Sequence, residues 1–348
     1  MGFGKLLSDL EGYSKPVSFE FLRGKRVAID GGLGFAQLSG LWHGLKQADV
    51  VARLLDVCAF VYVVFDGAPL PCKRDVKGKY PSAGPEDGGQ TPESALATAD
   101  RLNARFGARN FCAFVSPYEN DQQLAQLYYA GRVDLVVSAD SDMLVYGLPM
   151  VFHGTGNALK YFAADTLCLA AAACGLSVED FLVDAMQTYG CDYFKRHATK
   201  VFCGAAASRT EDYGELFRDL LQALYQFFYQ PVFCTESGHV ESLRPVPVLE
   251  RKLRAFLPAS VFGGFELPHY TPVSPAWVPW LQTRLAAAPA APYLPVWPYR
   301  SDSIFEAFGV WAWNGDISRI RFRDLEAHIG WVDRRGARAV GAYALPSE

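Results

Sequence analysis

Residues 135–147, with the sequence LVVSADSDMLVYG, decide the fold class of this chain. They join a short apolar run to two aspartates, Asp140 and Asp142, which are separated by a single serine. A short, continuous run of apolar residues is typical of a strand that is buried on both faces, as in a parallel sheet. The sequence therefore predicts a buried strand that carries two negative charges at its carboxyl end.

Four other segments share the character of this apolar run. Short β-branched or aromatic runs occur at residues 25–31, 58–67, 111–117 and 150–154. The apolar spacing of helices is found at residues 49–57, 91–107 and 119–131. Strands that alternate with helices indicate an α/β fold with a mostly parallel central sheet, covered by helices on both faces.

Length and composition exclude several classes of protein. The 348 residues fit one large domain or two smaller ones, and the 50% hydrophobic content is enough for a sizeable core. No run of 18 apolar residues predicts a membrane span, and the N-terminal stretch lacks the apolar region of a signal peptide. The eight cysteines form no C-x-x-C pair, which is typical of reduced thiols in an intracellular protein.

Acidic residues follow four of the predicted strands. They are Asp30, Asp66, Glu119, Asp121, Asp140 and Asp142. Because the carboxyl ends of parallel strands lie at one edge of the sheet, where ligands bind in open α/β folds, we expect these acids to lie close together. Each acid alone also fits a second interpretation, since Asp and Ser cap helices and acids are favoured in the first turn of a helix.

Six carboxylates at one edge of a sheet require a counter-charge. Like charges a few ångströms apart repel by about 1–4 kcal/mol per pair at effective dielectric constants between about 80 and 20. Hard divalent cations such as Mg²⁺ and Mn²⁺ prefer oxygen ligands of this kind. Sites that hold two such ions about 3.5–4 Å apart are typical of phosphodiester chemistry. No histidine accompanies these acids, and we interpret the six histidines as structural or exposed.

The motifs in the first 195 residues resemble those of the flap endonuclease/XPG superfamily of structure-specific 5′ nucleases. The resemblance is carried, in this order, by MGFGKLLSDL, VAID, VFDGAPLPCK, SPYENDQQLAQLYYAG, SADSDMLVYG and YGCDYF. The Y-E-x-D and G-C-D-Y variants are most similar to the 5′→3′ duplex-exonuclease branch. The resemblance implies a PIN-like 5′ nuclease core over residues 1–200. A divergent, helical and Pro-rich region at residues 201–348 is expected to pack on this core.

The resemblance also implies a metal site with seven acidic ligands, because it adds Asp192 to the six acids at the strand ends. One Mg²⁺ is then held mainly by Asp30, Asp66, Glu119 and Asp121. The other Mg²⁺ is held mainly by Asp140, Asp142 and Asp192. Mn²⁺ is expected to be able to replace Mg²⁺ at both positions.

The resemblance further implies residues that contact nucleic acid. Lys73 falls where the family has a lysine on the scissile phosphate, and Arg74 is a second candidate for offsetting charge there. Gly2 matches a small residue packed near the site, and Phe35 stands beside Ala36, the position of the base-stacking aromatic. Other candidate contacts are Lys77, Lys79, Lys195, Arg196 and Lys200. Without the seven acids the chain has 30 acidic and 33 basic residues, although a solvated face explains such basic runs equally well.

Three further features depart from the family pattern. A second cation, expected fourteen residues after Asp66, falls on Tyr80. The segment that should form a helical arch is short, and residues 80–94 are rich in Gly and Pro. The Gly-rich hairpin that holds duplex phosphates in the family should follow residue 192, where this chain has only Gly204.

Two classes of function follow from these patterns. The first is a divalent-metal-dependent 5′ nuclease that hydrolyses DNA, or RNA, by a two-metal mechanism. The second is a catalytically weak or inactive nuclease-fold module that binds nucleic acid or acts as a scaffold in RNA regulation. In both cases the expected partner is nucleic acid, and no association with a membrane is expected. The expected location is the nucleus, by analogy with the family, or else the cytoplasm.

Overall fold

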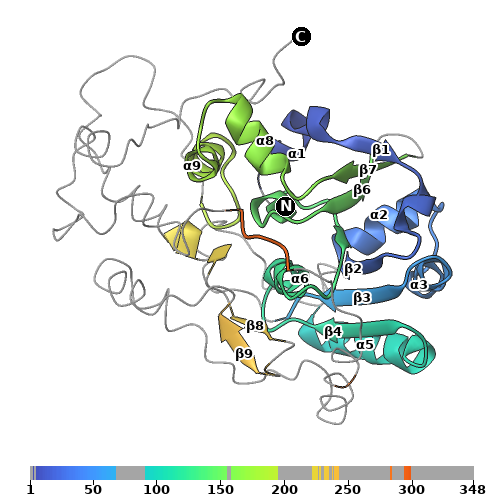
Figure 1. The fold of residues 1–348 in the computed structure, drawn as a ribbon. Coiled ribbons are helices and arrows are strands. Elements are labelled where there is room, and N and C mark those ends of the chain that lie inside the picture. Colours follow the sequence, from blue (N-terminus) through green and yellow to red (C-terminus); the bar gives the residue numbers. More distant parts are fainter. Residues whose placement is uncertain are drawn as a thin grey trace.

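A seven-stranded sheet forms the centre of the computed structural model (Figure 1). The structure describes residues 3, 5–67, 91–154, 158–194, 222–225, 227–228, 231–234, 237, 239–242, 283 and 294–298. The strand order is β1-β7-β6-β5-β2-β3-β4. Five mutually parallel strands are β2 (Arg26–Asp30), β3 (Phe60–Phe65), β4 (Phe111–Val115), β5 (Leu135–Val137) and β6 (Met150–His153). The predicted α/β class with a mostly parallel sheet is therefore confirmed.

Strand β2 occupies the middle of the parallel part of the sheet. Its Ile29 pairs with Val63 of β3 on one side and with Val137 of β5 on the other. All five residues of β2 are buried, as expected for a strand with helices on both faces. This central position places Asp30, the last residue of the strand, between the ends of its neighbours.

Two antiparallel strands complete one edge of the sheet. Strand β7 (Leu159–Phe162) pairs with β6, and β1 (Lys15–Val17) pairs with β7. Neither strand was predicted, because each is short and carries polar residues in place of a continuous apolar run. The sheet is therefore mixed, with its parallel strands leading into the acidic edge.

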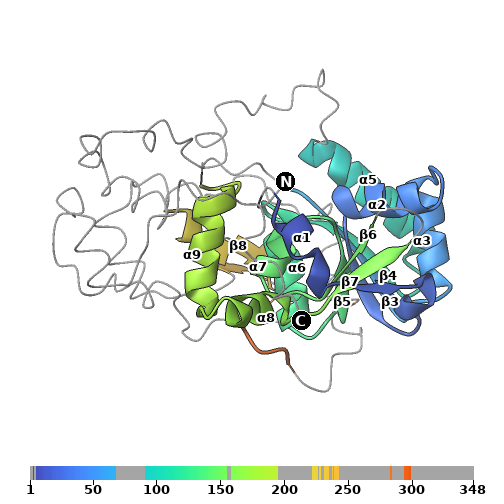
Figure 2. The ribbon, with the colours of Figure 1, turned by 90° about the horizontal axis from the view of Figure 1, so that it is seen from above.

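Helices cover the two faces of the sheet as separate sets (Figures 1 and 2). One face carries α2 (Leu33–Leu41), α3 (Gln47–Leu55) and α5 (Pro92–Phe106). The other carries α1 (Leu6–Asp9), α6 (Asn120–Tyr129), α7 (Asp142–Val145), α8 (Thr166–Ala173) and α9 (Val178–Tyr189). Short 3₁₀ turns occur at Glu11–Tyr13 and Phe19–Leu22. Successive residues of each strand point to opposite faces, so Tyr62 packs in one core and Val63 in the other.

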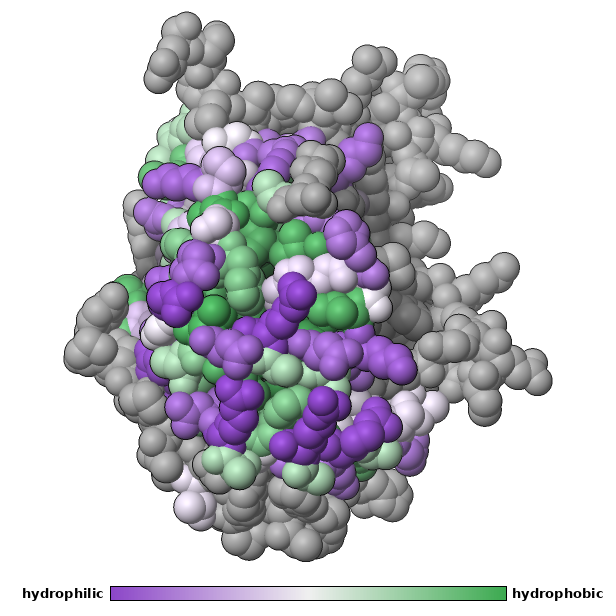
Figure 3. Space-filling model, turned by 90° about the vertical axis from the view of Figure 1, so that its right-hand side faces the viewer, coloured by the Kyte–Doolittle hydropathy of each residue, from purple (hydrophilic) through white to green (hydrophobic). Residues whose placement is uncertain are grey.

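Two of the helices predicted from apolar spacing show why they form: α5 has an identifiable start signal, and α3 has a buried apolar face. Helix α5 begins after Thr91, whose hydroxyl accepts the backbone N–H of Ser94 at 3.2 Å, and Pro92 fills its first position. Helix α3 buries Val50 and Leu54 and turns its polar residues outward. Figure 3 views the side of the molecule where α3 lies, and hydrophilic side chains there surround smaller apolar areas.

Helix α2 was not predicted, because it contains two glycines that lower helix propensity. Its Gly34 lies so close to the sheet that an added Cβ would stand 2.3 Å from the Val137 carbonyl oxygen. It would also stand 2.8 Å from the Ile29 side chain. Close packing of the helix on β2 and β5 therefore overrides its weak intrinsic propensity.

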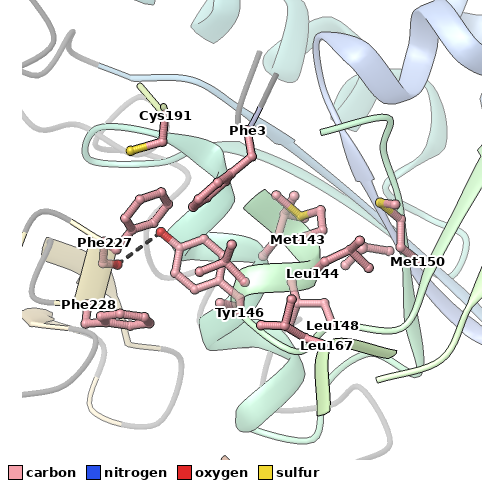
Figure 4. Packing of buried hydrophobic residues seen from close by; sticks show 14 of the residues in the cluster. Phe3, Met143, Leu144, Tyr146, Leu148, Met150, Leu167, Cys191, Phe227 and Phe228 are labelled. Atoms are coloured by element: carbon pink, nitrogen blue, oxygen red, sulfur yellow. Dashed lines mark hydrogen bonds between the residues drawn. The ribbon is translucent and has the colours of Figure 1, made fainter. Parts of the chain in front are cut away.

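The pieces described after residue 194 join the core of the sheet domain. Phe227 is fully buried in one cluster with Phe3, Met143 and Tyr146, and its carbonyl accepts the Tyr146 hydroxyl at 3.0 Å (Figure 4). Strands β8 (Pro231–Phe233) and β9 (Val240–Ser242) form a second, two-stranded sheet. The boundary expected at residue 200 remains a prediction. No helix in the described part of the chain is long and apolar enough to cross a membrane.

The second sheet is fixed to helix α6 by one buried glutamine. The side-chain amide of Gln123 donates to the Phe233 carbonyl at 2.9 Å, and its oxygen accepts the Phe233 N–H at 2.7 Å. Trp297 packs edge-on against Tyr129 of the same helix. Helix α6 is thus bonded to the second sheet through Gln123 and packed against Trp297 through Tyr129.

Candidate active site at the carboxyl edge of the sheet

Four strands lead into acidic residues at one edge of the sheet, as predicted. Asp30 ends β2, and Asp66 directly follows β3. Glu119 stands at the N-cap position of α6, after β4, and Asp140 follows β5. Because these strands run parallel, all four acids lie at the same edge.

Asp30 accepts four hydrogen bonds at this edge. Its Oδ1 accepts the backbone N–H groups of Gly32 at 2.9 Å and Leu33 at 3.1 Å, at the start of α2. The same oxygen accepts the Asn120 side-chain amide at 2.8 Å, and Oδ2 accepts the Ser138 hydroxyl at 2.8 Å. Asp30 thus holds the turn that leads into α2, whose N-cap residue is Gly32, alongside its place at the acidic edge.

Hydrogen bonds join this carboxylate to its acidic neighbours through two neutral residues. The backbone N–H of Asn120 donates to Asp66 Oδ1 at 2.9 Å. The hydroxyl of Ser138 accepts the Asp140 N–H at 3.0 Å, and Asp140 Oδ1 accepts the Asp142 N–H at 3.1 Å. Four of the predicted acids thus belong to one hydrogen-bonded chain that crosses three strand ends.

A glycine holds the exit of β3 against this edge. The N–H of Gly67 donates to the Tyr118 carbonyl at 2.5 Å. A Cβ on Gly67 would lie 2.0 Å from the Ser116 carbonyl oxygen, so only glycine fits between these backbones. The glycine of the FDG motif therefore fixes Asp66 beside the start of α6.

The remaining acids lie on or beside three helices. Asp121 is in the first turn of α6, Asp142 begins α7, and Asp192 follows the end of α9. Burial, with contributions from neighbouring charges that include Asp142 and Asp121, holds the pKa of Tyr146 well above its usual range. Burial, followed by the charge of Asp142 and with Asp192 contributing, also raises the pKa of the Cys191 thiol. The charge of Asp142 therefore contributes to both shifts.

Burial leaves negative charge at this edge incompletely compensated. Burial raises the pKa of Asp30, and the nearby charge of Asp140 adds to the rise. Hydrogen bonds from Ser138, Asn120 and Gly32 oppose the rise without cancelling it. A cation near these two carboxylates would lower the electrostatic cost of ionising both.

The donor set fits a hard divalent cation in its chemistry. Five of the seven acids are almost fully buried, with exposures of 3% for Asp30, 6% for Asp121, 6% for Asp140, 1% for Asp142 and 5% for Asp192. Their oxygens are the ligands that Mg²⁺ and Mn²⁺ prefer. In the described ranges, however, no three acidic, histidine or cysteine side chains stand together at metal-ligand spacing. The described side chains therefore supply suitable oxygen atoms, but no three of these side chains stand at the mutual distances of metal ligands.

The structure gives Phe35 a different place from the one expected. Its ring is 4% exposed and stacks on Phe65 with 6.3 Å between ring centroids, inside the core under α2. Burial of a large ring in a helix–sheet core is strongly favoured, which argues against the base-stacking role expected for Phe35. The other candidate contacts lie outside the described residues. They are Gly2, Lys73, Arg74, Lys77, Lys79, Lys195, Arg196 and Lys200.

Two residues of this edge, Asn120 and Ser138, were not singled out from the sequence, and both bridge the acids. Ser141, expected from the sequence as a possible helix cap, stands at the N-cap position of α7 without a side-chain capping bond, and its hydroxyl accepts the Phe3 N–H at 2.6 Å. The only sequence signal for Asn120 and Ser138 was position, because each stands directly beside an acidic residue or a strand end. Their partners lie far away in sequence, 90 residues for Asn120 and 108 for Ser138.

The raised pKa of Asp30 predicts that Asp30→Asn stabilises the fold at neutral pH. Burial disfavours the ionised carboxylate in the native state, so ionisation costs stability above the raised pKa. As pH falls through that pKa towards the unfolded value, the native carboxyl binds a proton first and the wild type recovers stability. In urea titrations with EDTA, the variant should exceed the wild type at pH 7, and the difference should shrink at pH 4. A difference that is the same at both pH values would contradict this assignment.

Comparison with protein families finds one match in the middle of the chain. Residues 110–192 match the family model of the XPG I-region. This span contains Glu119, Asp121, Asp140, Asp142 and Asp192, which are five of the seven predicted ligands.

Curated proteins similar to this chain include an exodeoxyribonuclease and a DNA damage-inducible protein. Exodeoxyribonuclease 1 of Schizosaccharomyces pombe is 28% identical over 229 residues, which is 56% of this chain and 40% of the relative. The DNA damage-inducible protein DIN7 of Saccharomyces cerevisiae is 26% identical over 179 residues, 45% of this chain and 41% of the relative. The chain thus spans about two-fifths of the length of these relatives.

Solved structures with similar folds include two that hold DNA. The catalytic core of Rad2 in complex with DNA substrate has 21% identity and a TM-score of 0.43, covering 56% of this chain and 63% of that one. Human GEN1 in complex with Holliday junction DNA has 17% identity and a TM-score of 0.42, covering 94% of this chain and 78% of that one.

Proposed function

The chain is a relative of the XPG and flap endonuclease superfamily, and from this premise we propose that it is a divalent-metal-dependent 5′ nuclease that hydrolyses DNA. One observation carries the proposal. Four of the seven predicted acids, Asp30, Asp66, Asp140 and Asp142, belong to a single hydrogen-bonded chain, and that chain runs into the segment that matches the XPG I-region. Exodeoxyribonuclease 1 and the DNA damage-inducible protein DIN7 both carry names that refer to DNA or its degradation, which supports DNA as the substrate.

In the proposed reaction the chain's own residues position charge around a phosphodiester. Asp30, Asp66, Glu119 and Asp121 are assigned to one Mg²⁺, and Asp140, Asp142 and Asp192 to the other, with Mn²⁺ as a substitute. Bound divalent ions would supply positive charge to the phosphate and make water more acidic.

Beyond the metal ligands, the proposal gives roles to basic residues. Lys73 and Arg74 offset charge on the scissile phosphate. Phosphates further along the strand are held by Lys77, Lys79, Lys195, Arg196 and Lys200. We also propose that the protein is located in the nucleus, by analogy with the superfamily.

A second function is favoured by one specific observation. Since no three described side chains stand at ligand spacing, a module that binds nucleic acid with little or no catalysis is the competing proposal. Such a module would bind nucleic acid at the basic residues and leave the substrate intact.

A cleavage assay separates the two proposals. Purified protein with Mg²⁺ or Mn²⁺ is incubated with labelled 5′-flap, nicked, blunt and single-stranded DNA, and with the matching RNA substrates. Metal-dependent release of 5′ products is expected from at least one DNA substrate, at a rate at least about 100-fold above that in EDTA, because metal ions stabilise the transition state by several kcal/mol. Binding without cleavage of any substrate would favour the module, and cleavage that survives both Asp140→Ala and Asp142→Ala would identify a contaminant.

A further inference from the structure

Asn120 occupies an unusual place at the acidic edge. It is the first residue of α6, stands between Glu119 and Asp121 in sequence, and is only 3% exposed. Its side-chain amide donates to Asp30 Oδ1 at 2.8 Å, and its backbone N–H donates to Asp66 Oδ1 at 2.9 Å. One residue therefore contacts two carboxylates that come from two neighbouring strands.

The side-chain amide also reaches the backbone of β3, the strand that leads into Asp66. It lies 3.3 Å from the Val64 carbonyl oxygen of β3, within hydrogen-bond distance. The Asn120 side chain thus ties the start of α6 to the ends of both β2 and β3, and this attachment places the Asn120 backbone N–H on Asp66. An amide is uncharged, so it can hold a carboxylate in place without neutralising it for a metal ion.

A second buried asparagine shows what a purely structural contact of this kind looks like. Asn103 of α5 is also 3% exposed, and its amide exchanges two hydrogen bonds with the backbone of Ala113 in β4, at 2.7 and 2.8 Å. These bonds join a helix to a strand, as those of Asn120 do. Neither reaches an acidic side chain, so Asn103 separates the cost of losing a buried amide from any effect on the acidic edge.

We propose that Asn120 is a positioning residue of the active site, which fixes the separation and orientation of Asp30 and Asp66. This inference rests on the proposed nuclease function. Neutral neighbours that orient metal-binding carboxylates typically change metal affinity or activity by about 10–100-fold when they are removed. Because Asn120 is buried and hydrogen-bonded to both carboxylates, its loss is expected to lower kcat and Mn²⁺ affinity and to leave KM for DNA unchanged.

The test compares Asn120→Ala with Asn103→Ala in the full chain. Mn²⁺ binding is measured without DNA by electron paramagnetic resonance, and kcat and KM are measured on the best DNA substrate. Both variants should lower the urea midpoint by similar amounts, because each loses a buried amide. Only Asn120→Ala should lower Mn²⁺ affinity and kcat by about 10–100-fold.

A second variant covers the case in which Asn120→Ala does not fold. Asn120→Asp keeps the side-chain size but places a carboxylate where Asp30 now accepts a hydrogen bond. Repulsion between the two carboxylates should displace Asp30, and kcat is expected to fall at least about 10-fold.

The possible results distinguish this inference from the proposed function. If the wild type cleaves DNA and Asn120→Ala matches Asn103→Ala in both Mn²⁺ affinity and kcat, the positioning role is overturned. The proposed nuclease function then still stands. A wild type that cleaves no substrate, but binds Mn²⁺ more tightly than Asn120→Ala does, would support the positioning role and overturn the nuclease. A wild type that binds no Mn²⁺ would overturn both.

Discussion

Asp140→Asn is expected to lower kcat for DNA cleavage by at least about 100-fold, equivalent to about 2.7 kcal/mol of transition-state stabilisation. Asp140 is buried, its Oδ1 accepts the Asp142 N–H, and its charge contributes to the raised pKa of Asp30. Asparagine keeps the side-chain size and an oxygen that can accept the same hydrogen bond. The substitution therefore removes mainly one negative charge from the acidic edge, and single-turnover cleavage with saturating enzyme measures the result.

A control for this variant lies at the opposite edge of the sheet. Asp134 precedes β5 and forms an ion pair with Arg26, and it also accepts the Arg26 backbone N–H at 2.8 Å. Asp134→Asn should lower stability, because Arg26 is buried and would lose its charged partner. It should leave kcat within about threefold of the wild type when corrected for folded protein, a difference of under 1 kcal/mol. Equal losses of kcat in the two variants would argue against a specific role for Asp140.

Phe227→Ala is expected to lower the free energy of unfolding by about 3–5 kcal/mol, the usual cost of deleting a fully buried phenylalanine. The Phe227 ring is 0% exposed and contacts the rings of Phe3, Tyr146 and Tyr193 at centroid distances of 5.7, 6.0 and 4.7 Å. These partners come from the first residues, from α7 and from the turn after α9. Urea denaturation followed by tryptophan fluorescence gives the free energy of unfolding.

The matched control for Phe227 is an exposed apolar residue from the same half of the chain. Val296 is 90% exposed, so Val296→Ala should change stability by no more than about 0.5 kcal/mol. If Phe227→Ala also costs less than about 1 kcal/mol, the pieces between residues 222 and 242 do not contribute to the core. A large cost would mean that a piece beyond residue 200 stabilises the sheet that carries the acids.

The parallel strands could be predicted from sequence because burial on both faces demands continuous apolar runs. Strands β2 to β6 all lie within the segments selected by this criterion. The antiparallel strands β1 and β7 escaped it, since both are short and their sequences, KPV and LKYF, include lysine. Helix α2 escaped for a different reason. Its glycine at position 34 disfavours an isolated helix but is required by the close approach to Val137.

The location of the candidate site was predictable, whereas its internal bonding was not. Parallel strands bring their carboxyl ends to one edge whatever the detailed packing, so Asp30, Asp66 and Asp140 could be placed together from sequence. The contacts of Asn120 and Ser138 depend on partners about a hundred residues away, and no local pattern reports them. For Phe35, the sequence could not distinguish a base-stacking ring from one that fills the adjacent core, where the structure places it.

The two interpretations of a strand-end acid need not exclude each other. Asp30 accepts two N–H groups in the turn that leads into α2, although the N-cap residue of that helix is Gly32, and its second oxygen accepts the Ser138 hydroxyl at the acidic edge. These bonds fix the carboxylate in one orientation, which pre-organises it for a further role. The local hydrogen bonds therefore account for how Asp30 is held, and the metal hypothesis addresses why its charge is kept.

The central position of β2 dictates when the candidate site can form as the chain leaves the ribosome. Strand β2 ends at residue 30, yet its partner β5 and the Ser138 hydroxyl are made 108 residues later. At about 5–20 residues per second, β2 waits roughly 5–20 seconds for β5. During this interval one side of an apolar strand has no partner, so the nascent chain passes through a stage that calls for chaperone protection. The acidic edge is completed only after the middle of the sheet has closed.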